Sequence, residues 1–386
     1  MKVLHYKNNN VESEIIGRIT FNKSLFTHRN ECIFILRKSE TLPAFSNLYR
    51  GILTEENLSI SVKGSGVIED SSEYHEGDIV LLTPDGKATF LYENGIDSNV
   101  LFITGKCNQR CLTCPQPPVN KEPDLTNVCK EIIKLAKNPT YFGISGGEPT
   151  VKKEKMIEVL RLLKKKHRNT AVTILSNAVR FSDTEFCEKL AAIDFNELQV
   201  DVPIFSDIPS IHNELVGAKN FYRTINGIYN LAEHKIKVGI RIVVNKLNYA
   251  RLPQISEYIF RNFTFVSQVA FMQMENKGLA FENLDKLWID PSECTASLSK
   301  AVRMLEERQI PAFIYNWQLC LLPADLRPLA TDSISPWKKV FCKECDPCLR
   351  KNDCPGFFAS NINMHSSHIT PFGMYNKDTE IGFQSI

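Results

Sequence analysis

The feature that most restricts the fold of this chain is a regular alternation of apolar, strand-like runs with helical stretches from residue 99 onward. Six such runs cover residues 100–103, 141–144, 172–175, 198–202, 238–244 and 265–272. The alternation predicts a parallel sheet built from βαβ units with right-handed crossovers. Because six units are too few to close an eight-unit barrel, the expected fold class is α/β, a partial (β/α)6 barrel similar to a TIM barrel.

Two further regions flank the predicted barrel domain of residues 97–310. Residues 1–96 contain short β segments and a hairpin turn signal at Pro84-Asp85-Gly86-Lys87, which predict a β-rich N-terminal domain. A helix is expected from Asp290, which would be its N-cap, to about Arg308. Residues 311–386 are loop-rich and predict a C-terminal cysteine-rich subdomain with a tail.

The composition limits the cellular locations and the classes of binding partner that are expected. The net charge of +2 gives no argument for binding nucleic acid or an anionic membrane. The chain contains no apolar run of ~18 residues and no signal-peptide core at its start, so a cytoplasmic location is expected. In a reducing compartment, twelve cysteines point to metal binding or catalysis before disulfides.

Four of these cysteines are isolated and lie in phase with apolar neighbours, so they are expected in the core as small buried side chains. They are Cys32, Cys129, Cys187 and Cys294. The remaining eight form two groups, which are the candidates for chemistry.

The first group is Cys107, Cys111 and Cys114, which directly follows the first predicted strand. Three thiolates on one loop can hold three irons of a [4Fe-4S] cubane and leave the fourth iron open. A structural zinc site that lacks a ligand, or chance, would also give this spacing. The second strand leads into Gly146-Gly147-Glu148-Pro149, whose glycines would let the backbone approach a ligand and whose Glu148 could accept from an ammonium group.

Taken together, these two motifs resemble the signatures of the radical S-adenosylmethionine (SAM) superfamily. The resemblance implies that SAM binds the open iron and is reductively cleaved to a 5′-deoxyadenosyl radical, with the three cysteines as catalytic residues. It also implies that Ser176, Asn177, Asp201 and Arg241 face SAM or the substrate, although Asp201 could instead cap a strand and Arg241 could lie on a solvated face. Thr113 departs from the family pattern, which usually has an aromatic residue there.

The second group comprises five cysteines, of which only four are needed for a closed site. Either Cys320 or Cys342 is therefore spare, and Cys320, Cys345, Cys348 and Cys354 are the expected set. Such a site could hold a second, auxiliary [4Fe-4S] cluster, which the neighbouring radical SAM motifs favour, or structural zinc.

The segments Leu319–Pro323, Ser333–Lys338 and Cys354–Phe358, together with Cys114–Pro118, resemble the C-type radical SAM maturase of the His-Xaa-Ser peptide-modification system. This resemblance implies a ribosomally made, His-Xaa-Ser-rich precursor peptide as substrate, a companion radical SAM maturase, and an electron donor such as flavodoxin or ferredoxin. Two alternatives stay open: a radical SAM enzyme of a small-molecule or cofactor pathway, and a non-catalytic Fe–S partner of another maturase. The N-terminal domain could hold the peptide or the companion.

Overall fold

The computed structural model describes residues 2–7, 10–25, 27–58 and 62–373. The chain divides into two compact units, which are described separately. The first contains Met1–Lys106, Val119–Leu175 and Glu188–Leu198; the second contains Cys107–Pro118, Ser176–Cys187 and Gln199–Ile386. The predicted domain boundaries after residues 96 and 310 stay predictions, and the predicted tail beyond residue 373 lies outside the described residues.

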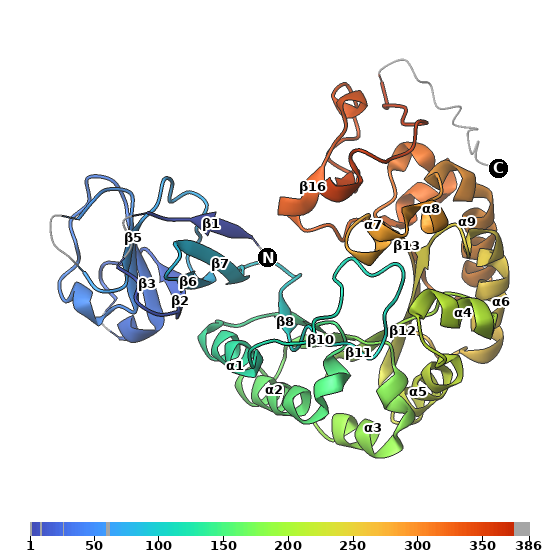
Figure 1. The fold of residues 1–386 in the computed structure, drawn as a ribbon, viewed down its shortest axis with the longest axis horizontal. Coiled ribbons are helices and arrows are strands. Elements are labelled where there is room, and N and C mark those ends of the chain that lie inside the picture. Colours follow the sequence, from blue (N-terminus) through green and yellow to red (C-terminus); the bar gives the residue numbers. More distant parts are fainter. Residues whose placement is uncertain (1, 8–9, 26, 59–61, 374–386) are drawn as a thin grey trace, which may run out of the picture. The chain divides into compact units, whose positions relative to one another are not determined.

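A mixed seven-stranded sheet occupies the N-terminal part of the first unit (Figure 1). Its strand order is β1-β7-β6-β2-β3-β4-β5, with parallel pairing from β2 to β5 and antiparallel pairing elsewhere. The strands are β1 (Val3–His5), β2 (Ile15–Thr20), β3 (Cys32–Leu36), β4 (Gly51–Thr54), β5 (Ser65–Val67), β6 (Ile79–Thr83) and β7 (Lys87–Tyr92). The turn predicted between β6 and β7 is present, with Gly86 at a φ of 80°.

The edge strand β5 of this N-terminal sheet pairs with the segment that follows β1. Lys7 exchanges two backbone hydrogen bonds of 2.8 Å with Val67, and the Asn10 N–H donates to the Ser65 carbonyl at 2.7 Å. Such pairing leaves few unsatisfied backbone groups along that edge. β3 is buried on both faces: Ile33 and Ile35 join one apolar cluster, and Phe34 joins another.

A second sheet of eight strands, ordered β15-β14-β13-β12-β11-β10-β9-β8, contains all six strands predicted for the barrel. The paired strands are parallel. They are β8 (Val100–Phe102), β9 (Tyr141–Ser145), β10 (Ala171–Leu175), β11 (Leu198–Pro203), β12 (Lys237–Val244), β13 (Gln268–Gln273), β14 (Ala312–Tyr315) and β15 (Ala330–Thr331). The α/β class with a parallel sheet and a separate β-rich sheet is therefore confirmed.

Two strands of this sheet were missed by the sequence analysis. β14 has four residues and β15 has two, and both lie in the region that was expected to be loop-rich. They are recognised only through their pairing, in which Ile314 lies opposite Ala330.

The helices follow the strands as expected for βαβ units (Figure 1). They are α1 (Thr126–Leu135), α2 (Lys153–Lys166), α3 (Thr184–Ala191), α4 (Pro209–Val216), α5 (Phe221–Glu233), α6 (Leu252–Asn262), α7 (Leu279–Glu282), α8 (Leu284–Leu287) and α9 (Pro291–Glu306). The predicted start of α9 is confirmed: Asp290 accepts a hydrogen bond of 2.9 Å from the Ser292 N–H. Such a cap is worth about 1 kcal/mol.

The four isolated cysteines lie in the core, as predicted. Cys32 and Cys187 are fully buried, and Cys129 and Cys294 are each 1% exposed. Within the described ranges, no helix combines the length and apolarity needed to cross a bilayer.

Candidate active site

The loop of Cys107, Cys111 and Cys114 begins shortly after β8 and is tied down by backbone hydrogen bonds to the end of α4. The Arg110 N–H donates to the Val216 carbonyl at 3.2 Å, and the Leu112 N–H donates to the Leu215 carbonyl at 2.8 Å. Gly217 ends α4 with a φ of 64°, and an added Cβ there would lie 2.7 Å from the Arg110 carbonyl oxygen. The glycine thus allows the loop to lie directly on the helix end.

The start of α7 holds the other end of the same loop. The Leu279 N–H donates to the Cys114 carbonyl at 2.9 Å. Gly278, which precedes α7, has a φ of 59° and a ψ of −131°, a conformation that L-residues rarely adopt. A Cβ on Gly278 would lie 2.7 Å from the Pro115 carbonyl oxygen. α4 and α7 therefore fix the backbone on both sides of the third cysteine.

The three thiols of this loop are half-buried. The Gln109 N–H donates to the Cys107 Sγ at 3.4 Å, and the Cys111 Sγ–H donates to the Gln109 side-chain oxygen at the same distance. Burial raises the pKa of the Cys114 thiol, and a backbone hydrogen bond of Gln116 opposes the rise. A donor set made of sulfur alone, on a loop whose backbone is held at both ends, fits an iron–sulfur cluster and does not fit a hard cation such as Mg²⁺.

Replacing Gly278 by Ala should displace the cysteine loop. The new Cβ meets backbone oxygens of Cys114 and Pro115, which have little freedom to move, and the strained backbone adds about 1–3 kcal/mol. We expect the variant to retain less iron after anaerobic reconstitution and desalting than the wild-type protein does. Gly95→Ala is the matched control, because Gly95 also has a positive φ, of 81°, but has no neighbouring atom within 4 Å. Equal iron retention in the two variants would contradict the clamping role.

The segment Gly146–Pro149 lies against the stretch of chain that leads into the cysteine loop. The Gly147 N–H donates to the Thr104 carbonyl at 2.7 Å, and the Glu148 N–H donates to the Lys106 carbonyl at 2.9 Å. An added Cβ on Gly146 would lie 2.3 Å from the Thr104 oxygen. The close approach that these glycines permit in this structure is thus to the chain's own backbone, whereas an approach to a ligand was predicted.

Glu148 is 1% exposed and acts as the N-cap of the short helix Pro149–Lys152. Its carboxylate accepts hydrogen bonds from the Thr150 N–H at 3.0 Å and the Thr150 hydroxyl at 2.6 Å. These bonds hold the carboxylate in one position. The motif alone did not predict these bonds to Thr150. The predicted role of Glu148 as an acceptor for an ammonium group stays a prediction.

Ser176 and Asn177 follow β10 and are both buried. Their side-chain oxygens accept hydrogen bonds from the N–H groups of Ala178 and Val179, each at 3.1 Å, so the pair shapes the turn after the strand. The Asn177 amide also donates to the Asn108 side-chain oxygen at 2.8 Å. This contact links the predicted polar pair to the residue that follows Cys107.

Asp201 and Arg241 lie on adjacent strands, β11 and β12, within electrostatic range of one another. Burial raises the pKa of Asp201, while the Arg241 charge and a hydrogen bond of 2.7 Å from the Gln199 amide oppose the rise. Arg241 is half-buried, and its Nε lies 3.1 Å from the Met272 Sδ. The roles predicted for Asp201 and Arg241 toward SAM or the substrate stay predictions.

His212, on the helix that holds the cysteine loop, should make stability depend on pH. Burial lowers its pKa from 6.5 to about 4, and its Nδ1 accepts from the Phe205 N–H at 3.4 Å. The unfolded chain binds this proton below pH ~6.5 and the folded chain does not, so up to about 3 kcal/mol of stability is lost as pH falls from 6.5 toward 4.

The variant His212→Asn keeps an acceptor for the Phe205 N–H but cannot titrate. Its free energy of unfolding, measured by urea titration between pH 7 and pH 5, should fall less steeply than that of the wild-type protein. Equal slopes would show that His212 is not the responsible group.

The second cysteine group lines a single pocket. Cys320, Cys345, Cys348 and Cys354 all contribute to it, together with apolar side chains such as Phe341 and Phe372. Burial raises the pKa of Cys320, and the nearby Cys354 and Cys348 thiolates add to the rise. The predicted set of four thiols is thus brought together, while Cys342 does not line this pocket.

Some residues of the site were missed by the sequence analysis. Asn108 was not predicted, and its side-chain oxygen accepts the hydrogen bond from the Asn177 amide. Glu122 was also missed; its carboxylate accepts from the Thr104 hydroxyl and the Gly105 N–H just before the cysteine loop. Contacts of this kind join residues that are distant in sequence, so no local spacing marks them.

Comparison with known proteins supports the chemistry of the first motif. Residues 101–259 match the family model of the radical SAM superfamily. The cofactor-modifying protein of the tungsten-containing aldehyde ferredoxin oxidoreductase from Pyrococcus furiosus is 30% identical over 171 residues, which are 41% of this chain and 47% of that protein. The GTP 3′,8-cyclase of Petrotoga mobilis is 27% identical over 179 residues, 45% of this chain and 52% of that protein. The chain thus spans about half the length of these curated relatives.

Among solved structures, Streptococcus suis SuiB is similar with a TM-score of 0.45 and 16% identity, covering 56% of this chain and 48% of that one. A radical SAM methyltransferase from Sphaerobacter thermophilus has a TM-score of 0.44 and 14% identity, covering 64% and 74%. The family match covers β8 to β12 together with the cysteine loop and Gly146–Pro149. Residues 101–259, which include the cysteine loop and Gly146–Pro149, therefore resemble the radical SAM superfamily, and this resemblance implies a [4Fe-4S] cluster and SAM.

Proposed function

We propose that this chain is a radical SAM enzyme, which uses a [4Fe-4S] cluster and SAM, and that it modifies a ribosomally made precursor peptide rich in His-Xaa-Ser repeats. The observation that carries the proposal is the second cysteine pocket. The segments around Cys320 and Cys354, which resemble the C-type maturase of the His-Xaa-Ser system, contribute thiols to that one pocket. We assign an auxiliary [4Fe-4S] cluster to it, held by Cys320, Cys345, Cys348 and Cys354, because a sulfur-only donor set suits iron–sulfur chemistry, with structural zinc as the alternative occupant.

Cys107, Cys111 and Cys114 are assigned to the SAM-binding cluster. When bound, the cluster and SAM supply the one-electron chemistry that starts the reaction. The chain's own contribution is to hold the three thiols on a loop fixed by α4 and α7, so that one iron is left without a protein ligand.

The polar residues at the ends of the barrel strands are proposed to bind SAM or orient the substrate. They are Gly146, Gly147, Glu148, Pro149, Ser176, Asn177, Asp201 and Arg241. The burial of Glu148 and its two bonds to Thr150 support an orienting role, since a carboxylate held in one position loses little entropy when it binds an ammonium group. The half-buried Arg241 offers a positive charge beside Asp201 for a carboxylate.

The decisive experiment is anaerobic reconstitution of the full chain, followed by dithionite, SAM and a synthetic peptide with His-Xaa-Ser repeats. We expect 5′-deoxyadenosine to form and the peptide to change in mass. A scrambled peptide of the same composition is the control. An unchanged His-Xaa-Ser peptide, with 5′-deoxyadenosine formed, would refute the peptide assignment while leaving the radical SAM activity in place.

A second candidate is a small-molecule substrate of a cofactor pathway. It is favoured by the curated relatives, which include a cofactor-modifying protein and GTP 3′,8-cyclases. GTP should therefore be tested in the same assay. Formation of 5′-deoxyadenosine that depends on GTP and not on peptide would favour this candidate.

The remaining partners belong to the same proposal. They are a companion radical SAM maturase and an electron donor of the flavodoxin or ferredoxin type. The proposal also includes a cytoplasmic location. The N-terminal sheet could hold the peptide or the companion. Because residues 7 and 10 already pair with β5, a peptide would have to bind a face, a loop or another edge of this sheet.

A further inference from the structure

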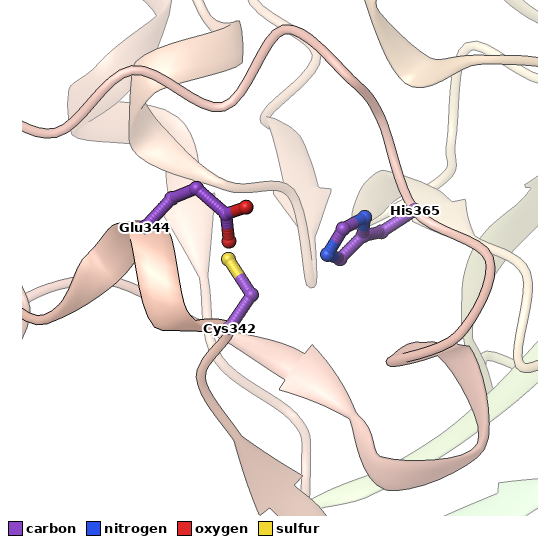
Figure 2. Close-up of side chains that lie close together, drawn as sticks. All are labelled: Cys342, Glu344 and His365. Atoms are coloured by element: carbon purple, nitrogen blue, oxygen red, sulfur yellow. The ribbon is translucent and has the colours of Figure 1, made fainter.

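Three side chains with different donor atoms converge next to the four-cysteine pocket. They are Cys342, Glu344 and His365, and one ligand atom from each lies within 4.8 Å of the other two (Figure 2). Cys342 and Glu344 lie at the start of the short helix Lys343–Cys345, whereas His365 comes from the loop after the helix Ala359–Asn361. Figure 2 shows the thiol and the carboxylate side by side, with the imidazole ring turned toward them.

The surrounding structure brings Cys342 and His365 together, and the exposed Glu344 lies two residues after Cys342. Strands β16 (Lys339–Val340) and β17 (Phe357–Phe358) pair with each other, and this pairing brings the segment before Cys342 beside the segment that leads to His365. The Phe357 ring packs against the His365 ring with centroids 5.1 Å apart. Cys342 is 6% exposed, so its sulfur is largely withdrawn from water. His365 also lines a pocket together with Trp317 and Asn361.

We propose that Cys342, Glu344 and His365 bind a single divalent metal ion of the zinc class. A thiolate and a carboxylate together neutralise the charge of a divalent ion, and a neutral imidazole adds the third ligand. Zinc accepts this mixture of sulfur, oxygen and nitrogen, whereas Mg²⁺ and Ca²⁺ take oxygen ligands. The three protein ligands leave one position of a tetrahedral ion for water or another ligand.

The site gives Cys342 a role distinct from that of the four-cysteine set. Its Sγ lies 3.4 Å from the Cys345 Sγ, yet only Cys345 lines the neighbouring pocket. The simpler alternative is a hydrogen bond from the Cys342 thiol to the Glu344 carboxylate, with no metal. That alternative needs no imidazole, so the contribution of His365 separates the two.

The test uses the full-length protein with its clusters reconstituted, then incubated with Zn²⁺ and desalted. We expect about one zinc per chain, and absorption at the zinc edge, which iron does not affect, should show one sulfur and two nitrogen or oxygen protein ligands. His365→Ala should lower zinc affinity at least about 10-fold without loss of iron, because it removes one of three ligands. His368→Ala is the matched control: this histidine lies on the same loop but faces Asp290, with 3.6 Å between the Nδ1 and a carboxylate oxygen.

Three results would overturn the proposal. Zinc surrounded by four sulfur atoms would place the ion in the four-cysteine pocket. Zinc binding that His365→Ala leaves unchanged would exclude the imidazole. Loss of iron in Cys342→Ser would make Cys342 a cluster ligand. Since His365→Ala removes a ring from a loop, its unchanged iron content also reports that the variant is folded.

Discussion

Replacing Cys111 by Ala is expected to abolish reductive cleavage of SAM, lowering 5′-deoxyadenosine formation by at least about 100-fold. The loss should be this large because each of the three thiols of the loop is proposed to hold one iron. The reconstituted variant should also lose about four irons per chain. Chromatographic measurement of 5′-deoxyadenosine with dithionite as reductant checks the first effect, and a colorimetric iron assay checks the second.

Cys187→Ser provides the control for this prediction. Cys187 is fully buried, and its Sγ–H donates to the Phe181 carbonyl at 3.3 Å, a bond that a serine hydroxyl can keep. This variant should keep its iron and its activity. A Cys111→Ala protein that still cleaved SAM at the wild-type rate would rule out the assignment of this loop.

Replacing Cys348 by Ala should separate the two chemistries of the protein. We expect about half of the iron to be lost, with SAM cleavage retained and modification of the peptide lost, because the four-cysteine pocket has no role in binding SAM in our proposal. Iron content, 5′-deoxyadenosine and peptide mass are measured on one sample. Cys342→Ser is the comparison, since it changes the neighbouring thiol but should leave the iron content intact. Unchanged iron accompanied by loss of zinc would show that the pocket holds zinc and not a cluster.

Six strands of the parallel sheet were predicted because each coincides with an apolar run that alternates with helical stretches. β12, for example, spans Lys237–Val244 and was expected over residues 238–244. The N-cap of α9 was also predicted, because aspartate can accept a hydrogen bond from the first turn and proline favours the first helical position. β14 and β15 could not be predicted, since their existence depends on pairing with distant strands.

For the site, the sequence predicted which residue types would gather but not how they are supported. The four cysteines that line one pocket were the favoured set, with Cys342 left open as the alternative to Cys320. By contrast, the role of Gly217 depends on where α4 ends relative to the cysteine loop. The role of Gly278 depends on where α7 begins. The group of Cys342, Glu344 and His365 was not predicted, because His365 lies in a separate loop and no metal-binding spacing connects it to the other two.

The short distance between Cys342 and Cys345 has a practical consequence for handling the protein. With the two sulfurs 3.4 Å apart, dioxygen could withdraw two electrons and two protons from the unmetallated thiols and join them as a disulfide. That bond would remove one thiol from each of two neighbouring sites at once. Preparations made in air should therefore be treated with a strong thiol reductant before any metal is added, and the recovered free thiols counted.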